Sequence, residues 1–446
     1  MNAPQHASLY EVQAQIYPRA VSGVYAWLRW AAVWATQLVY YGFPWLTWND
    51  RQAVLFDIVH RKFYLFGLVF WPQDVVYLTA LLILAALSLF LFTAVAGRVW
   101  CGYACPQTVY TEIFMWIERV IEGDRNARIR LDAMPPSKKF PRKAAKHAAW
   151  IAFAAWTGFT FVGYVTPIRE LWSEMLDLST GPWETFWIAF YGFATYGNAG
   201  WMREQVCKYM CPYARFQSAM FDKDTLIITY DAKRGEPRGK GEAKGDCVDC
   251  GICVQACPTG IDIRNGLQYE CIGCAACIDG CNQVMDKVKR PRGLIRYSTT
   301  HALEGRKTDL LRPRVLIYSA ILLAIAAAMG VSLYLRVPLK LDVIRDRAAI
   351  AREVEGGLIE NVYRLQVMNT AEQARALELS VSGLPGLQLW GEPTLGVGAA
   401  TSSMVLAKVR LPADGAKPGS YPIEFRLRSL GREGIEVRER SVFVVQ

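Results

Sequence analysis

The sequence contains little histidine and little charge for its length. Only four histidines occur among 446 residues, and no two of them lie four residues apart on an apolar stretch, so neither paired axial haem ligation nor an H-E-x-x-H zinc site is predicted. A strand-flanked GxGxxG run and a GxxxxGK[ST] run are also missing, which argues against a dinucleotide or nucleoside-triphosphate site. Charged residues make up 20% of the chain and hydrophobic residues 52%, a balance uncommon in a soluble globule.

Long apolar runs account for this balance. Five stretches lack Asp, Glu, Lys and Arg altogether, and each has the length of about 20 residues that crosses a bilayer. They are residues 30–49, 75–97, 148–168, 185–202 and 315–335. We therefore expect a polytopic α-helical membrane protein with about five spans. The shorter apolar block at residues 63–73 is expected to be an interfacial or re-entrant segment, with a buried helix as the alternative.

The charge around these runs predicts their orientation. The segment between the second and third runs, residues 98–147, carries ten Lys and Arg residues, whereas the next turn contributes only Arg169. Because Lys and Arg accumulate in short cytoplasmic loops, the first segment is expected inside the cell. The N-terminus and residues 203–314 then lie in the cytoplasm, and the C-terminal domain lies outside it. The net charge of +10 follows from this topology, and no nucleic-acid partner is predicted.

Eight of the twelve cysteines form two nearly identical runs. Residues 247–258 read C-x2-C-x2-C-x3-C-P and residues 271–281 read C-x2-C-x2-C-x3-C, the spacing of bacterial ferredoxins with two 4Fe–4S clusters. In such proteins the last cysteine of each run ligates the other cluster. Hence Cys247, Cys250, Cys253 and Cys281 are expected to hold one cluster, and Cys271, Cys274, Cys277 and Cys257 the other. Zinc is the alternative, but the repeated triplet followed by an x3 cysteine favours clusters.

The other four cysteines form a second repeat, just past the second and fourth apolar runs. The chain reads Cys-Gly-Tyr-Ala-Cys-Pro from Cys101 and Cys-Lys-Tyr-Met-Cys-Pro from Cys207. The x3 spacing puts both sulfurs on one side of a helical turn, and the proline is expected to end or kink the helix there. We expect Cys101, Cys105, Cys207 and Cys211 to converge on one site. Cu(I), a further iron–sulfur cluster, zinc, a disulfide cycle and plain apolar packing are the competing interpretations.

Two further segments complete the predicted domain organisation. Residues 231–246 are charged and rich in glycine, which predicts a linker. Residues 339–446 alternate apolar and polar side chains in short runs between Gly and Pro turns, which predicts an Ig-like β-sandwich without a disulfide. The remaining domains are a membrane domain over residues 1–230, a ferredoxin-like domain with two 4Fe–4S clusters over 247–300, and a fifth span within 301–338.

Taken together, these features resemble the FixG/CcoG-type accessory proteins of cytochrome c oxidase. The resemblance rests on the twin Cys-x3-Cys-Pro runs, the tract from Tyr230 to Arg238, the two-cluster ferredoxin runs, and the outer domain with its segment from Asn361 to Asn369. It implies a bacterial inner-membrane protein that helps to assemble cbb3-type oxidase and reduces Cu(II) to Cu(I) for that purpose. Copper chaperones or oxidase assembly factors would be its partners, together with an unidentified electron donor.

The resemblance also implies roles for the cysteines. The eight ferredoxin cysteines become the ligands of two 4Fe–4S clusters, and Cys101, Cys105, Cys207 and Cys211 become the catalytic and candidate copper-binding residues of a cupric reductase. Two other functions are considered. One is a quinol-linked ferredoxin subunit that feeds periplasmic reductases, against which the outer sandwich argues. The other is a non-enzymatic scaffold for oxidase assembly, against which reversible cluster reduction coupled to copper turnover would argue.

Overall fold

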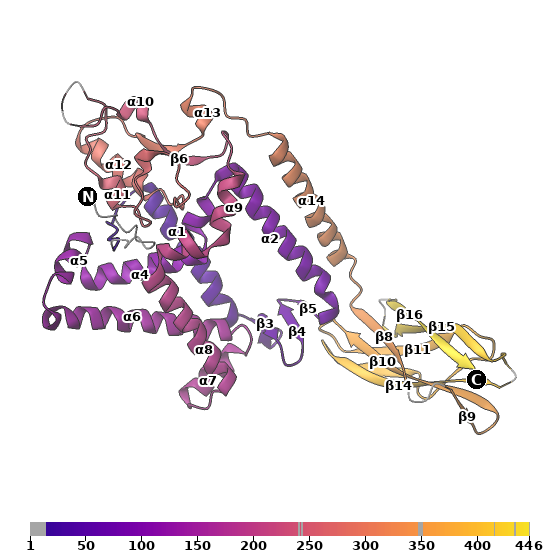
Figure 1. Ribbon diagram of the computed structural model, residues 1–446. Helices are drawn as coiled ribbons and strands as arrows, with labels where there is room; N and C mark the ends of the chain where they lie inside the picture. Colours follow the sequence, from indigo (N-terminus) through magenta and orange to yellow (C-terminus); the bar gives the residue numbers. More distant parts are fainter. Residues whose placement is uncertain are drawn as a thin grey trace, which may run out of the picture. The chain divides into compact units, whose positions relative to one another are not determined.

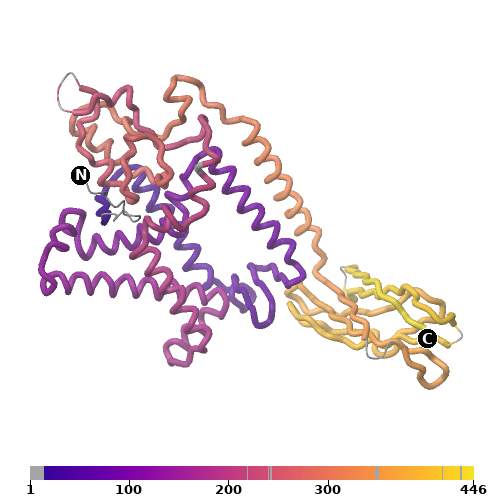
Figure 2. The backbone as a smooth tube through the Cα atoms, viewed as in Figure 1, coloured from indigo at the N-terminus to yellow at the C-terminus, as the bar shows by residue number. Residues whose placement is uncertain are grey.

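The protein folds as two compact units, each made from two segments of the chain. The computed structural model describes residues 15–239, 241, 244–346, 351–413, 415–431 and 434–445. The first unit consists of Met1–Leu46 and Leu78–Ala326, and the second of Thr47–Tyr77 and Ala327–Gln446. The first is mainly helical and the second is mainly β-sheet, as Figures 1 and 2 show.

All five apolar runs form helices, although their limits differ from the predicted ones. The helices are α1 (Val24–Gly42), α2 (Val75–Ala96), α6 (Pro136–Val162), α8 (Pro182–Thr195) and α14 (Pro313–Tyr334). The first helix begins before its apolar run and stops at Gly42, because a short 3-10 turn with Pro44 follows it. Helix α6 continues the third run backwards through basic residues into a helix of 27 residues.

Two of these helices have the length and composition of membrane spans. Within the described residues, Pro72–Ala96 and Pro313–Tyr334 meet both conditions, with mean hydropathies of 2.6 and 2.3. In the most apolar 18-residue window of each stretch, only 0% and 6% of the residues are buried inside the protein. Such apolar, uncovered helices indicate association with a membrane. The total of five spans stays a prediction.

The fourth apolar run is only partly α-helical. Helix α8 passes directly into a π-helix, η3 (Tyr196–Met202), and a second π-helix, η4 (Val206–Met210), follows Arg203. Arg203 has a φ of 39°, in the left-handed region that a side chain with a Cβ rarely adopts. Because π-helical turns are rare and concentrate at functional positions, this segment marks the neighbourhood of Cys207. The shorter helices of this unit are α3 (Val99–Tyr103), α4 (Pro106–Glu122), α5 (Arg125–Asp132), α7 (Ile168–Leu176) and α9 (Pro212–Met220).

The ferredoxin-like part begins earlier than predicted. Strand β6 (Ile227–Tyr230) pairs with β7 (Ile295–Ser298) in antiparallel register, so the two cysteine runs lie between paired strands. Between these strands lie α10 (Ala232–Gly235), α11 (Ile252–Gln255), the 3-10 turn η5 (Ile263–Asn265) and α12 (Ala276–Lys287). A short helix, α13 (Thr300–Leu303), follows β7.

The predicted linker at residues 231–246 differs from a free tether. The Gly245 amide donates to the Pro237 carbonyl oxygen, and the Asp246 amide donates to the Arg234 carbonyl oxygen. The Gly239 amide also donates to the carbonyl oxygen of Cys247. The described part of this segment is therefore folded back against the first cysteine run.

The second unit contains the predicted Ig-like sandwich. One sheet has the strand order β12-β14-β10-β8 with β9 paired to β10, and the other has the order β13-β11-β15-β16. Inward side chains such as Tyr363, Val409 and Phe425 are fully buried between the sheets. The strands are β8 (Leu339–Arg345), β9 (Arg352–Val354), β10 (Leu358–Asn369), β11 (Arg375–Ser382), β12 (Gln388–Trp390), β13 (Thr394–Val397), β14 (Ser402–Pro412), β15 (Gly419–Ser429) and β16 (Glu436–Val445).

The block at residues 63–73 consists of strands followed by the 3-10 turn η2 (Pro72–Asp74), so the alternative of a buried helix is wrong, while the interfacial or re-entrant segment stays a prediction. It forms most of a three-stranded antiparallel sheet of β3 (Val54–Asp57), β4 (Lys62–Leu65) and β5 (Leu68–Phe70), preceded by the hairpin of β1 (Thr47–Trp48) and β2 (Arg51–Gln52). Aromatic and β-branched side chains in short alternating runs stabilise such strands. Ion pairs from Arg51 to Glu372 and from Asp74 to Arg336 join this segment to the sandwich.

Candidate redox site

Two cavities in the ferredoxin-like part are lined by cysteines from both runs. One is lined by Cys247, Cys250, Cys253 and Cys281, with Arg264 and apolar side chains around them. The last of these cysteines comes from the second run, as crossed ligation requires.

The other cavity joins the remaining members. It is lined by Cys257, Cys271, Cys274 and Cys277, and Cys253 also touches it. Four isoleucines, Ile228, Ile261, Ile263 and Ile272, give it a dry wall. Each predicted set of four thiols therefore surrounds one cavity.

The number of thiols around each cavity matches the ligand set of a 4Fe–4S cluster. Among the described residues, no three Cys, His, Asp or Glu side chains lie close enough to hold one metal ion. Zinc binds its thiolates at about 2.3 Å and so draws them into a compact tetrahedron. A 4Fe–4S cubane is larger and holds its four thiolates further apart. The residues present thus fit two cubanes.

Local backbone geometry explains how each run wraps a cavity. The residue after the second cysteine, Gly251 or Ala275, is left-handed, with φ of 66° and 59°. Each then starts a helix that carries the third cysteine, Cys253 on α11 and Cys277 on α12. Helix α12 is long enough to carry Cys281 as well, one turn further on.

Burial changes the acidity of these thiols. It raises the pKa of Cys253 to about 11 and the pKa values of Cys271 and Cys281 to about 12. Ligand thiols must lose their protons to bind metal, so loading the clusters releases protons.

The four remaining cysteines occupy two equivalent turns. Cys101 lies on α3 and Cys207 on η4, while Cys105 and Cys211 are the N-cap residues of α4 and α9. Helix α3 ends at Tyr103 and η4 at Met210, just before the two Cys-Pro pairs, so the predicted helix ends are confirmed. Each proline also stands at the first position of the following helix, where its missing N–H costs nothing.

The structure brings these four thiols into one neighbourhood. Burial is the largest cause that raises the pKa of Cys207 to about 12, and the nearby Cys105, Cys101 and Cys211 add to it. Burial likewise raises the pKa of Cys101 to about 11, with Cys105 and Cys211 again adding. The Cys101 thiol donates to Gln217 Oε1 at 3.4 Å.

This neighbourhood lies directly against the second cluster cavity. Cys101 and Cys207 pack on a buried group that contains Cys274, Ile272 and two alanines. A Cβ atom on Gly102 would lie 2.7 Å from the Cα of Cys274, so only glycine allows α3 to approach this loop so closely.

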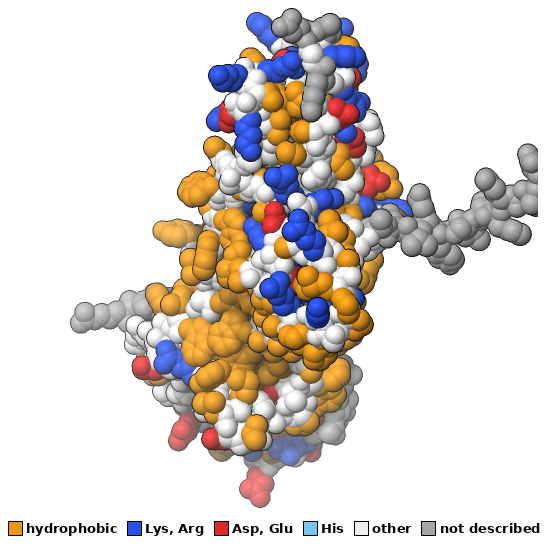
Figure 3. Space-filling view, turned by 90° about the vertical axis from the view of Figure 1, so that its left-hand side faces the viewer, with side chains coloured by type: hydrophobic (Ala, Val, Ile, Leu, Met, Phe, Trp, Pro, Cys, Tyr) orange, Lys and Arg blue, Asp and Glu red, His pale blue; other side chains and the backbone are white. Residues whose placement is uncertain are grey.

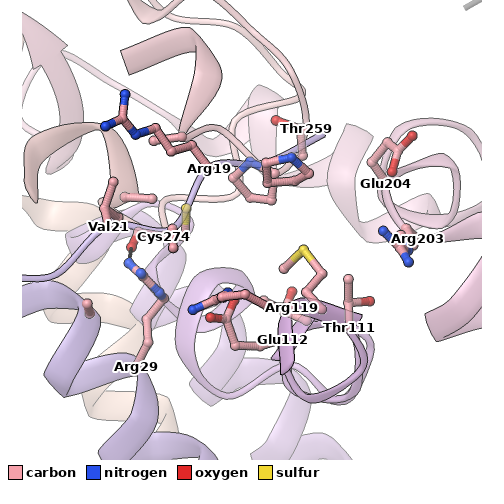
Figure 4. Close-up of a pocket in the computed structure, with 18 of the residues that line it drawn as sticks. Arg19, Val21, Arg29, Thr111, Glu112, Arg119, Arg203, Glu204, Thr259 and Cys274 are labelled. Atoms are coloured by element: carbon pink, nitrogen blue, oxygen red, sulfur yellow. Dashed lines mark hydrogen bonds between the residues drawn. The ribbon is translucent and has the colours of Figure 1, made fainter. Parts of the chain in front are cut away.

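Two buried arginines reinforce the contact. Arg29 Nη1, on α1, donates to the Cys274 carbonyl oxygen at 2.6 Å, and Arg98 Nη1 donates to the Cys271 carbonyl oxygen at 3.2 Å. Figure 4 shows Arg29 reaching toward Cys274 across the end of a polar pocket, which Cys207 also lines. The sequence prediction missed both residues. Their position at the edges of apolar runs is the feature that could have revealed them, since a charge there is costly without a partner.

A buried ion network supports the turn that leads to Cys207. Glu118 on α4 pairs with Arg128 at 2.8 Å and with Arg203 at 3.0 Å, and Lys146 on α6 lies 3.1 Å from Glu122. All five side chains except Arg203 are less than a tenth exposed. The network therefore fixes Arg203, the left-handed residue between the two π-helices, relative to α4 and α5.

These features define a membrane-associated iron–sulfur electron-transfer protein. They are the two cysteine-lined cavities, the second thiol site beside them, the apolar helices and the Ig-like sandwich. The family model of a 4Fe–4S dicluster domain matches residues 202–300, and that of a 4Fe–4S binding domain matches residues 78–122. The model of the Ig-like fold at the C-terminus of FixG matches residues 329–446.

Whole-chain relatives give the family. Nitrogen fixation protein FixG of Rhizobium meliloti (strain 1021) is 39% identical over 423 residues, which cover 84% of this chain and 81% of FixG. Protein RdxB of Cereibacter sphaeroides is 39% identical over 440 residues, which cover 93% of this chain and 92% of RdxB. The chain belongs to the FixG family, and the predicted resemblance is confirmed. A crystal structure of a FixG-related protein from Vibrio parahaemolyticus aligns with 24% of this chain and 97% of its own, at 25% identity and a TM-score of 0.23.

Proposed function

We propose that this protein reduces Cu(II) to Cu(I) for the assembly of cbb3-type cytochrome c oxidase. The observation that carries the proposal is the packing of Cys101 and Cys207 against the buried group that contains Cys274. Soft thiolates prefer Cu(I) over Cu(II), so a thiol site beside an electron source favours the reduced product. One electron per copper ion is required.

The ligand sets are part of the proposal. Cys247, Cys250, Cys253 and Cys281 would hold one 4Fe–4S cluster, and Cys257, Cys271, Cys274 and Cys277 the other. When bound, the clusters supply reversible one-electron storage. The protein's own residues keep water from the second cavity with the isoleucine wall, and Arg29 and Arg98 fix its loop against the membrane domain.

The thiols would act on copper as soft ligands. Cu(I) needs as few as two thiolate ligands, so two of these four thiols would suffice to hold it. Cys105 and Cys211 are suited to this because each is the N-cap residue of a helix, next to the unpaired backbone amides of the first turn. Hydrogen bonds from the Thr108 and Gln107 amides oppose the rise that burial imposes on the pKa of Cys105.

A second candidate role for the same four thiols is ligation of a third 4Fe–4S cluster. The match of a 4Fe–4S binding model to residues 78–122, which contain Cys101 and Cys105, favours it. In that case copper would be reduced at the edge of this site, with the thiolates as cluster ligands. Electrons would still pass from the clusters of the ferredoxin-like part to this site and then to copper, as in the first proposal.

The cellular setting is proposed from the charge distribution. Five spans in a bacterial inner membrane would leave the N-terminus and the ferredoxin-like part in the cytoplasm and the sandwich in the periplasm, since Lys and Arg concentrate in residues 98–147. Copper chaperones or oxidase assembly factors would be the partners.

The test is anaerobic copper reduction by purified, pre-reduced protein. The wild type is compared with a variant in which Cys101, Cys105, Cys207 and Cys211 are all changed to Ser, while cluster absorbance and iron content are followed. We expect Cu(I) to form with cluster oxidation in the wild type and to fall at least tenfold in the variant. Equal reduction by both proteins would remove the four thiols from the reaction.

Iron content separates the two roles of the thiol site. If the thiols bind copper alone, the quadruple variant retains all the iron of the wild type. If they ligate a third cluster, the variant loses the four iron atoms of one cubane. Gln217→Ala is the control for a general disturbance of this site. It removes the hydrogen-bond partner of the Cys101 thiol but leaves all four sulfurs in place.

A further inference from the structure

The two cluster cavities differ in their access to the outside. Cys250, which lines the first cavity, is exposed, and no other cysteine of the chain is. In the second cavity, Cys274 and Cys277 are buried at 9% exposure and Cys257 and Cys271 are partly buried. Because electron transfer falls off steeply with distance, a soluble donor reaches the protein most easily at the first cavity.

A basic segment borders this first cavity. Residues 287–296 carry five positive charges, at Lys287, Lys289, Arg290, Arg292 and Arg296, and no negative one. The segment is held near the cavity on both sides. Val284 and Met285, just before the segment, and Leu294 and Ile295, near its end, all line the cavity. Arg290 also contacts the Gly245 carbonyl oxygen, two residues before Cys247. Figure 3 shows Lys and Arg side chains gathered at the top of the molecule, where the ferredoxin-like part lies.

Carboxylates around this cavity are already engaged. Asp286 pairs with Arg292 at 2.7 Å, Asp249 pairs with Arg264 at 2.6 Å, and Asp246 pairs with Arg234. Lys287 and Lys289 are exposed and form no ion pair within the described part of the chain. Their charge is therefore available to a partner.

We propose that this basic rim, residues 287–296 around Cys250, docks a small acidic one-electron carrier protein of the ferredoxin type. Complementary charge steers such encounters and raises the association rate by about 10- to 1000-fold at low salt. In each encounter the [2Fe–2S] centre of the donor loses one electron and this protein gains one. No bond forms or breaks and no proton moves. The proposal goes beyond copper reduction, because it concerns electron entry and needs no copper.

The experiment measures electron entry alone, on the full-length protein in detergent without copper. Reduced plant-type [2Fe–2S] ferredoxin, which is acidic, is mixed with the oxidised protein under anaerobic stopped-flow conditions. We expect Lys287→Glu/Lys289→Glu to lower the second-order rate constant about tenfold or more at low ionic strength. At about 1 M salt, where the Debye length falls to about 3 Å, the two proteins should converge.

Two controls make the result specific. Lys138→Glu/Arg142→Glu changes the net charge equally at two exposed positions of α6 and should leave the rate near that of the wild type. Reduced methyl viologen, a small cation, should reduce the Lys287→Glu/Lys289→Glu protein at least as fast as the wild type, which shows that its clusters are intact. An unchanged ferredoxin rate in that variant, or an equal loss in the α6 variant, overturns the proposal.

Discussion

Gly102 and Cys274 meet so closely that a single added carbon atom does not fit between them. A Cβ on Gly102 would lie 2.7 Å from the Cα and 2.8 Å from the amide nitrogen of Cys274. Both of those atoms belong to backbone, which cannot rotate away as a flexible side chain can. The helix that carries Cys101 is thus joined to the loop of the second cluster cavity by backbone contact.

The first prediction concerns this contact. Gly102→Ala should force the Cys274 loop away from α3, because overpacking of this kind costs about 1–3 kcal/mol. We expect clusters to be lost at a lower temperature, measured by the decay of cluster absorbance on heating, and copper reduction to slow. Gly330→Ala on α14 is the matched control, since nothing lies within 4 Å of the added carbon. Equal thermal behaviour of the two variants would contradict the prediction.

The second prediction concerns Arg29. Reduction adds negative charge to a cluster, and a buried guanidinium beside its ligand favours that state. Arg29→Met should therefore lower the potential of the cluster near Cys274 and leave the other potential unchanged, as measured by redox titration with EPR detection. Arg29→Lys keeps the charge but not the hydrogen-bonding fork, so its potential for this cluster should lie between those of the wild type and Arg29→Met. A shift of both clusters together would indicate a general structural change.

The third prediction concerns the buried network. Glu118→Gln removes the carboxylate that faces Arg128 and Arg203, and uncompensated buried charges cost about 3–5 kcal/mol. Thermal unfolding in detergent should show this loss. Glu112→Gln, also on α4, should change stability by less than about 1 kcal/mol, because Glu112 forms no ion pair within the described residues. If both variants unfold alike, the network does not hold the turn.

The fourth prediction concerns the Ig-like sandwich and pH. Burial opposes ionisation of Glu360, but hydrogen bonds and charge from Arg352 and Arg410 outweigh it and hold its pKa below the usual range. A carboxyl group whose pKa is lower in the folded state stabilises that state above its unfolded pKa, and the contribution is lost as the pH falls through the folded value. The sandwich should therefore lose stability below about pH 4.5, the ordinary value for a glutamate.

Hydrogen exchange of β10, corrected for the intrinsic pH dependence of exchange, measures this effect. Glu360→Gln should lose about 1.5–3 kcal/mol at neutral pH and should show a flatter acid profile. Glu424→Gln, in the half-exposed pair with Arg426, should keep the steep profile of the wild type. A steep profile in the Glu360 variant would assign the acid sensitivity to another group.

Sequence alone predicts the parts of this protein that depend on local spacing. The cysteine triplets define their cavities because a short turn leaves few ways to wrap a cubane, and the sandwich strands follow from strict alternation. The long apolar runs predict helices because they too are a local pattern in the sequence. Contacts between distant segments have no such local pattern, so the packing of Gly102 on Cys274 and the hydrogen bond from Arg29 to the Cys274 carbonyl oxygen are visible only in the fold.

The errors of prediction have physical causes. Residues 63–73 are apolar enough to suggest a buried helix, but their hydrophobic side chains pack in a small sheet joined to a domain that begins more than 250 residues later. Pro106 and Pro212 follow helix ends as the sequence predicts, but each also begins a new helix at its first position, which the cysteine spacing does not reveal. The described part of residues 231–246 forms backbone hydrogen bonds that its charged, glycine-rich composition does not suggest.

The ion pair between Arg51 and Glu372 joins residues 321 positions apart in the chain. A ribosome synthesises the small sheets of residues 47–70 long before it reaches the sandwich that they contact. During that interval these strands have only one another to pair with, and the second unit is completed only after the cysteine-bearing segments have been made. Chains truncated before residue 372 therefore lack this ion pair.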